Sequence, residues 1–310
     1  MADEETLDEI NKLPESLLVQ IISLLPIKDA FKTSLVSKKW QHLWTCTDNV
    51  VLLCNKHSEA ENFVSFVDYA FAQRSSSKIR KFYLDFWSIA RYSFNVKQWL
   101  TYVIENQVED IKLESVFSDM YTLPQVLYTC SSLRTLSLSD CAFDLRAVIS
   151  WKSLKKLKLE HVKLYNEVIV KLLSGCPALE SLELSLFHSF RRLEINNPNL
   201  KILKLKDIWP EYEEGDHTLE IVAPYIQHLE ISSDIDDFKC RLVDVSSLVT
   251  AEITFDIRCE SDIQDDYEYG EFDKCCNYHR AFWMLVQDYL HKLRHVTELT
   301  IGTWFVEVYY

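Results

Sequence analysis

The side chains that could do chemistry in this chain are its nine cysteines and the histidines near some of them. Cys54 lies three residues before His57. Cys275 and Cys276 lie shortly before His279. Thiolate and imidazole groups are preferred zinc ligands, but a closed zinc site needs four of them. Neither group has a second half at a suitable spacing elsewhere, so we expect no metal site and interpret most of the cysteines as small buried hydrophobic residues.

Other chemistry finds little support in the sequence. The acidic run Ser261–Lys274 has the composition of a calcium loop, but a loop that begins at Asp262 needs glycine at its sixth position, where Tyr267 stands. No G-x-S-x-G, glycine-rich phosphate loop or H-E-x-x-H motif is present. The nine cysteines could include a nucleophile for thioester formation, but none has an adjacent histidine or a cationic setting that the sequence can establish. We therefore expect no catalytic residue and no cofactor, and interpret the acidic run as a solvated insertion or a docking patch for a basic partner.

A leucine-rich repeat runs through most of the chain. The segment SLRTLSLSDC follows the pattern L-x-x-L-x-L-x-x-C from Leu133, and SLKKLKL, ALESLEL and NLKILKL repeat it from Leu154, Leu179 and Leu200. Weaker copies begin at Ile79, Val108, Ile226, Leu248 and Val296, and Phe190 begins a shortened one. One such unit cannot bury its leucines alone, whereas stacked units share a continuous core.

This repeat predicts an α/β fold, an irregular solenoid shaped like a horseshoe with a parallel sheet on its concave side. Helices are expected over NEVIVKLLSG, with Gly175 as C-cap, and over AFWMLVQDYLHKLRHV. Residues between the leucines face solvent on the sheet. The candidate substrate-binding residues on that face are Lys156, Lys158, Lys204, Lys206, Glu230 and Glu252.

The charge of the chain is acidic and unevenly distributed. The sequence has 33 basic and 47 acidic residues, a net charge of −14, and 20 acidic but only 3 basic residues lie from Asp207 to Asp273. An acidic chain binds phosphate backbones poorly, so we expect no nucleic acid, and the acidic part favours a basic protein partner. No run of 18 apolar residues and no secretory signal is visible, so we expect no membrane span and a protein of the nucleus or cytoplasm.

The stretch LPESLLVQIISLLP, from Leu13 to Pro26, predicts a short helix that is apolar nearly all round. Pro14 suits the first helical position and Pro26 ends the helix. Two further short helices are expected over 27–45, the second with Trp40, Leu43 and Trp44 at helical spacing. Three short helices bury too little surface to cover the first one, so the solenoid or another protein must cover part of it.

Residues 13–45 resemble the F-box motif. The resemblance rests on the start Leu13-Pro14, the corner LPIKD at Leu25–Asp29 and the segment VSKKW at Val36–Trp40. Together with the repeats, the chain resembles the plant F-box/leucine-rich-repeat family. The resemblance implies an F-box over 9–50, a connector over 51–75 and a leucine-rich-repeat solenoid over 76–310, with a further segment of strands and helix after Tyr310.

The same resemblance implies a non-catalytic substrate-recognition subunit of an SCF (Skp–cullin–F-box) ubiquitin ligase. The F-box would dock on the Skp-type adaptor, and the solenoid would bind the protein to be ubiquitinated. Motif position assigns adaptor contact to Leu13, Pro14, Leu17, Leu18, Ile21 and Leu25, with Trp40 bracing the helices. The alternatives are a leucine-rich-repeat scaffold outside any ligase and, as in the hormone receptors that some family members resemble, a small ligand on the lysine stripe.

Overall fold

The computed structural model describes residues 9–54, 56–74, 78–115, 120–187, 190–207, 218–234, 240–256, 283–284 and 286–302. The chain divides into two compact units, Met1–Ser153 and Leu154–Tyr310, which we call unit 1 and unit 2. Within the described residues, no helix combines the length and the apolar character that crossing a membrane would require.

Unit 1 begins with the short helices of the F-box segment. Helix α2 (Glu15–Ile22) begins after Pro14, which is its N-cap and not its first residue as we expected. It ends at Ile22, before Pro26, which is the N-cap of helix α3 (Ile27–Thr33). The third predicted helix is instead two 3₁₀ turns, η1 (Lys38–Trp40) and η2 (Leu43–Cys46). Each turn brings its tryptophan inside, since Trp40 and Trp44 are both buried.

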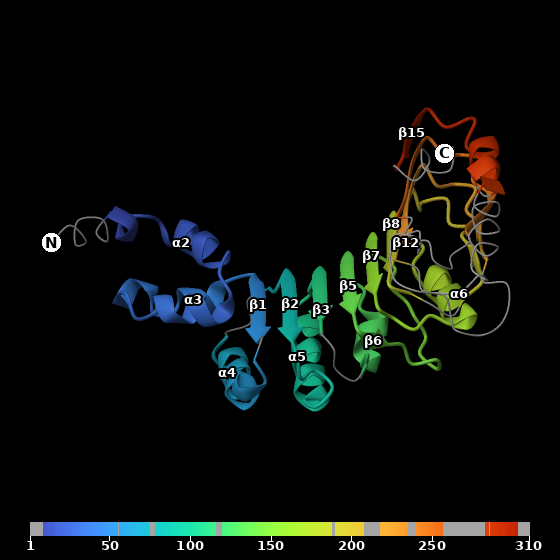
Figure 1. Cartoon of the computed structure of the whole chain (residues 1–310). Helices are drawn as coiled ribbons and strands as arrows, with labels where there is room; N and C mark the ends of the chain where they lie inside the picture. Colours follow the sequence, from blue (N-terminus) through green and yellow to red (C-terminus); the bar gives the residue numbers. More distant parts are fainter. Residues whose placement is uncertain are drawn as a thin grey trace, which may run out of the picture. The chain divides into compact units, whose positions relative to one another are not determined.

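The rest of unit 1 is built from strand–helix repeats. Its parallel strands have the order β1 (Asn49–Cys54), β2 (Lys81–Phe86), β3 (Asp110–Glu114) and β5 (Thr135–Ser139). Helix α4 (Ala60–Gln73) follows β1 and helix α5 (Ser93–Glu105) follows β2, and the two helices lie side by side (Figure 1). The smaller elements are η3 (His57–Glu59), η4 (Gln125–Thr129) and the paired strands β4 (Tyr121–Thr122) and β6 (Cys141–Ala142).

Unit 2 continues the pattern with two sheets (Figure 1). Its main sheet has the order β7 (Lys156–Glu160), β8 (Ser181–Ser185), β10 (Ile202–Lys206), β12 (His228–Asp234), β14 (Thr250–Asp256) and β15 (Glu298–Ile301), all parallel. The second is a parallel sheet of β9 (Arg192–Glu194), β11 (Leu219–Val222) and β13 (Cys240–Asp244). Helix α6 (Asn166–Gly175) packs against β9, and residues 286–292 are helical.

Each repeat is joined to the next by the same backbone contacts. The carbonyl of Lys155, just before β7, accepts hydrogen bonds from the N–H groups of Glu180 and Ser181 at 2.8 and 3.0 Å, and equivalent pairs of bonds recur between later strands. The residue after a strand is left-handed in four repeats, with φ between 46° and 54°, at Asp140, His161, Leu186 and Asp207. Because these four strands end in the same turn, their units stack in register.

The repeat leucines form the core, as the spacing predicts. Leu136, Leu157, Leu182 and Leu203 point into the core and are buried, while the residues between them alternate to the other face. The predicted parallel α/β sheet is therefore confirmed. The weakest copy, at Val296, Leu299 and Ile301, is only half-buried within the described residues.

The region predicted as a connector, 51–75, holds regular structure. Most of β1 lies in it and pairs with β2 from Asn49↔Lys81 to Cys54↔Phe86, and α4 follows. Residues 49–73 therefore form one more strand–helix unit, and the repeat begins earlier than we expected. The sequence hides this unit because Thr47, also buried, takes the anchor position that leucine takes elsewhere.

The structure agrees with the two predicted outer helices to different extents. Helix α6 covers the predicted stretch, but Gly175 is its last residue and Cys176 is its C-cap, which has φ −122° and does not need glycine. The second stretch is helical over 283–284 and 286–292. The acidic run Ser261–Lys274, the cysteines Cys275 and Cys276, and the chain end at Tyr310 lie outside the described residues.

Candidate partner-binding surfaces

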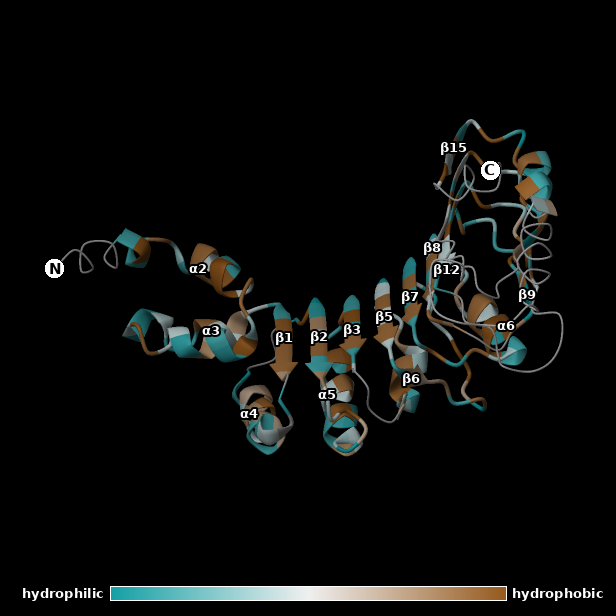
Figure 2. Ribbon diagram, in the orientation of Figure 1, coloured by the Kyte–Doolittle hydropathy of each residue, from teal (hydrophilic) through white to brown (hydrophobic). Residues whose placement is uncertain are grey.

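The F-box segment leaves several large apolar side chains uncovered. Leu17 and Ile21 on α2 are 43% and 40% exposed, and Leu24, one turn further, is 80% exposed. Leu35 and Val36, just after α3, are 82% and 48% exposed. We call Leu17, Ile21, Leu24, Leu35 and Val36 the exposed F-box residues. Figure 2 shows brown, apolar segments on α2 and a mixture of brown and teal on α3.

Helix α2 sorts its apolar residues onto two faces. Leu18 and Ile22 are fully buried, whereas Leu17 and Ile21 are exposed. Residues four apart share a face of a helix, so each pair forms one stripe. Leu18, which we expected to contact an adaptor, instead packs inside unit 1 and offers no surface to a partner.

The other predicted contact residues fall between these extremes. Pro14 is exposed, and Leu13 and Leu25 are half-buried. Leu24, Leu35 and Val36 were not predicted, although the spacing of Leu17, Ile21 and Leu24, four and then three residues, is that of one helix face and could have indicated Leu24.

Trp40 is buried and joins the start of the F-box segment to its end. Its Nε1 donates a hydrogen bond of 2.7 Å to Oδ1 of Asn11. The neighbouring Lys39 donates from Nζ to the carbonyl of Leu13 at 2.8 Å. These contacts hold the segment before α2 against η1, which supports the predicted bracing role.

An aromatic cluster fixes the F-box segment to the first repeat. The Phe31 ring of α3 lies 5.3 Å from Trp44 and 5.7 Å from Phe66 of α4, both edge to face, a favourable geometry for aromatic pairs. Arg74, at the end of α4, is buried and donates to the Trp44 carbonyl at 3.5 Å and to Oγ1 of Thr47 at 3.3 Å. Burial lowers the pKa of the Arg74 guanidinium. Unit 1 therefore holds the F-box helices firmly against β1 and α4.

The second uncovered surface is the face of the main unit 2 sheet that points away from the buried leucines. We call it the open face; the predicted residues Lys156, Lys158, Lys204, Lys206, Glu230 and Glu252 all lie on it. Strand register places side chains of opposite charge next to each other. Lys158 is opposite Glu183, Glu183 is opposite Lys204, and Lys204 is opposite Glu230.

Ion pairs neutralise most of the predicted lysine stripe. Lys158 lies 3.0 Å from Glu160 and 3.6 Å from Glu183. Glu230 accepts hydrogen bonds from Lys204 and from Lys206, whose Nζ is 3.0 Å from its carboxylate. The stripe that we expected is thus not a free basic surface, because glutamates of neighbouring strands lie between its lysines.

The titration of these groups follows from the same contacts. Burial acts to raise the pKa of Glu230, but hydrogen bonds from Lys204 and Lys206 outweigh it and hold that pKa below its ordinary value. The hydrogen bond to Glu230 also raises the pKa of Lys206. Both shifts favour the charged forms, so the network stays ionised at neutral pH.

Comparison with known proteins identifies both regions. A family model of the F-box domain matches residues 10–49, and a model of the leucine-rich repeats of FBD-associated F-box protein At5g56370 matches residues 96–246. The putative F-box protein At1g49610 of Arabidopsis thaliana is 31% identical over 98% of this chain and 72% of its own length. The chain belongs to the F-box/leucine-rich-repeat family.

Two further relatives from Arabidopsis thaliana agree with that assignment. The putative F-box/LRR-repeat protein At5g02930 is 30% identical over 95% of this chain, and F-box protein At5g03100 is 29% identical over 97% of it. This F-box/leucine-rich-repeat chain spans 60% and 91% of their lengths. The resemblance of its motifs to the family is confirmed.

Most of the cysteines that the structure describes in this F-box/leucine-rich-repeat protein are poorly suited to nucleophilic chemistry. The six within the described residues are free thiols, and five of them are buried. Burial raises the pKa of Cys141, Cys176 and Cys240 to about 12 each, so these thiols are protonated at neutral pH. The described residues contain no group of three metal-ligating side chains, and the His57 side chain lies outside them.

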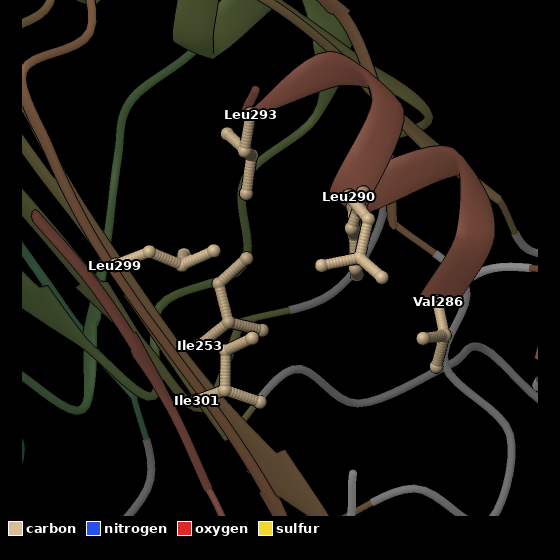
Figure 3. Close-up of a pocket in the computed structure, with 7 residues that line it drawn as sticks. Ile253, Val286, Leu290, Leu293, Leu299 and Ile301 are labelled. Carbon is tan, nitrogen blue, oxygen red and sulfur yellow. The ribbon is translucent and has the colours of Figure 1, made fainter. Parts of the chain in front are cut away.

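A small pocket in unit 2 does not supply a chemical site either. Figure 3 shows it between β14, β15 and the helical residues 286–292. Its lining is apolar except for Tyr289, and consists of Ile253, Val286, Tyr289, Leu290, Leu293, Leu299 and Ile301. The Tyr289 hydroxyl donates a 2.7 Å hydrogen bond to the Cys240 carbonyl. Ligand sites combine an apolar lining with convergent polar groups, which this pocket lacks.

Proposed function

We infer that this protein is a non-catalytic substrate-recognition subunit of an SCF-type ubiquitin ligase. In this proposal the F-box docks on a Skp-type adaptor, and the leucine-rich-repeat region binds the protein to be ubiquitinated. The observation that carries the proposal is the set of exposed F-box residues, in a chain whose relatives are named F-box proteins. Large apolar side chains left in water at one end of a folded chain favour a second protein that covers them.

The energetics require that several of these residues are buried together. Burying one leucine contributes about 1.5–3 kcal/mol, whereas association costs about 4–15 kcal/mol of lost freedom. Leu24 and Leu35, each about four-fifths exposed, gain the most from being covered. They are therefore the strongest candidates for the centre of the adaptor interface.

The proposed mechanism is proximity. Binding a substrate beside a charged conjugating enzyme raises the effective concentration of the substrate lysine and needs no catalytic side chain from this protein. The packing of Phe31 and Arg74 against the first repeat supports this mechanism, because a firmly held F-box limits the positions that the first repeats sample relative to the adaptor. We propose that the protein acts inside the cell, where thiols such as Cys46 stay reduced.

Co-purification with a Skp-type adaptor tests the proposal. The full chain is expected to retain the adaptor, and the double variant Leu17→Asp/Ile21→Asp is expected to lose it, because two charges would be placed in the apolar interface. The matched control is Val170→Asp, which changes an apolar residue that is 64% exposed on α6. Equal retention by all three proteins would refute the docking role. Failure of the unaltered chain to retain any adaptor would instead favour a scaffold outside the ligase.

A reconstituted reaction tests the second half of the proposal. With adaptor, cullin, RING protein and conjugating enzyme present, ubiquitin should be transferred without a thioester forming on this chain. A reducible ubiquitin adduct on any of its cysteines would contradict the non-catalytic assignment.

A further inference from the structure

The open face of unit 2 has opposite charges at its two ends. One row of residues crosses all six strands in register: Lys156, Ser181, Ile202, His228, Thr250 and Glu298. The row begins with an exposed lysine on β7 and ends with an exposed glutamate on β15. Glu252, also exposed, lies on β14 two residues beyond Thr250 and faces the same side. Within unit 2, the β7 side of the face therefore carries an exposed lysine and the side of β14 and β15 carries two exposed glutamates.

These end charges differ from the charges between them. Lys158, Lys204 and Lys206 are already paired with Glu160, Glu183 and Glu230. In the parts of the chain that the structure describes, no ion pair involves Lys156, Glu252 or Glu298. A partner can thus form new ion pairs at the two ends of the face without breaking an existing one.

The residues in the middle of the row, between Lys156 and Glu298, are suited to contact with an extended segment of a partner protein that crosses the strands. The His228 ring nitrogen lies 2.6 Å from the Thr250 hydroxyl, and these two side chains and Ser181 are only half-buried. Ile202 offers a half-buried apolar contact between Ser181 and His228. These hydroxyl, imidazole and aliphatic side chains can contact an extended segment that has no charged residue at this point.

We propose that the open face binds an extended segment of the substrate protein that carries an acidic residue over Lys156 and basic residues over Glu252 and Glu298. This inference rests on the proposed function for the identity of the partner as a substrate. Strands are about 4.8 Å apart, so Lys156 lies about 19 Å from Glu252 and about 24 Å from Glu298 along the sheet. An extended chain covers these distances in about six to seven residues. Side chains two apart in an extended chain point to the same side, so the recognised segment has an acidic residue and, six and eight positions away in either chain direction, two lysines or arginines.

Charge complementarity selects this occupant. A uniformly basic segment would leave Lys156 facing a like charge, and a uniformly acidic one would oppose both glutamates. The acidic part of the sequence, Asp207–Asp273, contributes Glu230 on β12 and Glu252 on β14 to the face, and Glu252 lies on the side next to β15 and Glu298.

Fluorescence anisotropy with a synthetic nine-residue peptide tests the inference. The probe has glutamate at position 1, lysine at positions 7 and 9, and serine and threonine elsewhere, so that all three charges point to one side of an extended chain. A second peptide of the same composition places the glutamate between the lysines. The full chain is expected to bind the first peptide more tightly than the second, and the difference should shrink between 25 and 150 mM salt, since exposed charges are screened over about 8 Å at the higher strength.

Variants assign the binding to named residues. Glu252→Gln and Glu298→Gln should each weaken binding of the first peptide about two- to fivefold, the range expected for an exposed ion pair. The double variant Glu252→Lys/Glu298→Lys should reverse the preference toward a peptide with glutamates at positions 7 and 9. The control Glu105→Gln removes an exposed charge from the end of α5 in unit 1 and should change nothing.

The outcomes separate this inference from the proposed function. Absence of binding, equal binding of the two peptides, or equal losses with Glu105→Gln would overturn it. Adaptor retention is measured on the same preparations and should not respond to Glu252→Gln. If the unaltered chain did not retain the adaptor but still bound the first peptide selectively, the ligase role would be refuted and the inference about the open face would be supported.

Discussion

The exposed F-box residues and the open face are two uncovered surfaces in the described part of this chain, and their chemistry is opposite. The first presents aliphatic side chains such as Leu24 and Leu35 directly to water. The second presents a row of lysines and glutamates, most of which already pair with one another. An apolar surface gains free energy from any partner of matching shape, whereas a neutralised charged surface gains only where its remaining charges are met.

This difference suits two kinds of partner. A constant partner, such as an adaptor shared by many receptors, can be bound by hydrophobic burial that salt hardly affects. A partner that must be distinguished from others is better recognised by charge position, because misplaced like charges oppose binding. The two surfaces should therefore respond differently to the same perturbations, and the following variants are ordered from the largest expected effect to the smallest.

The largest effect is expected at the apolar surface. Leu24→Asp/Leu35→Asp should weaken adaptor binding by about 3–6 kcal/mol, more than a hundredfold, since two leucines would no longer be buried. The free energy of unfolding should change little, because both side chains are exposed in the free chain. Biolayer interferometry and urea unfolding measure the two quantities. A large loss of stability with unchanged affinity would mean that these leucines serve the fold and not the interface.

Neighbouring leucines of α2 sharpen that distinction. Leu18→Ala should lower the free energy of unfolding by about 2–5 kcal/mol because it leaves a cavity in the core, whereas Leu17→Ala should leave stability nearly unchanged and weaken adaptor binding. Thermal unfolding and titration with adaptor give both values for each variant. If the two substitutions gave the same profile, the assignment of the two helix faces would be incorrect.

A smaller effect is expected where the F-box meets the first repeat. Arg74→Met removes the buried donor to the Thr47 carbonyl and one of the two donors to the Trp44 carbonyl, which keeps its bond from the Thr47 hydroxyl. Loss of the buried donor should cost about 1–3 kcal/mol of unfolding free energy. Hydrogen exchange should speed up in η2. Arg80→Met is the control, because the Arg80 ion pair with Asp48, at 3.1 Å, is exposed. Equal losses in the two variants would show that burial of Arg74 has no special role.

The smallest effect is expected at the open face. The pKa of Glu230 is lowered in the folded chain, so its stabilising contribution is present above the unfolded value near 4.5 and is lost as pH falls through the folded value. Glu230→Gln should therefore reduce stability at pH 7 by about 1 kcal/mol or less and should flatten the loss of stability below pH 4.5. Chemical unfolding at pH 3 to 7 measures both. Glu252→Gln removes no ion pair within the described ranges. This variant should show the same loss of stability below pH 4.5 as the unaltered chain.

Much of the fold could be predicted because one frame repeats along the chain. Leucine at the same positions of successive units predicts strands, burial and parallel pairing together. The first unit was missed because Thr47 satisfies its buried hydroxyl through the Trp44 carbonyl and so replaces the expected leucine. The sheet of β9, β11 and β13 was also missed, since only β9 belongs to a copy of the repeat, the shortened one at Phe190.

The candidate surfaces were harder to predict than the core. The sequence indicated that α2 needs cover, but it could not separate Leu17 from Leu18, because which stripe turns inward depends on contacts with distant residues. It also assigned four lysines to one stripe without their partners. Glu183 and Glu230 lie on neighbouring strands, and only the strand register brings them beside Lys158 and Lys204.

Hydroxyl-radical footprinting of the full chain with and without a Skp-type adaptor tests the central claim most directly. The account predicts that Leu17, Ile21, Leu24, Leu35 and Val36 lose reactivity when the adaptor is added, while Val170, exposed on α6, keeps its own. Unchanged labelling of Leu24 and Leu35 under conditions where the adaptor is bound would contradict the account.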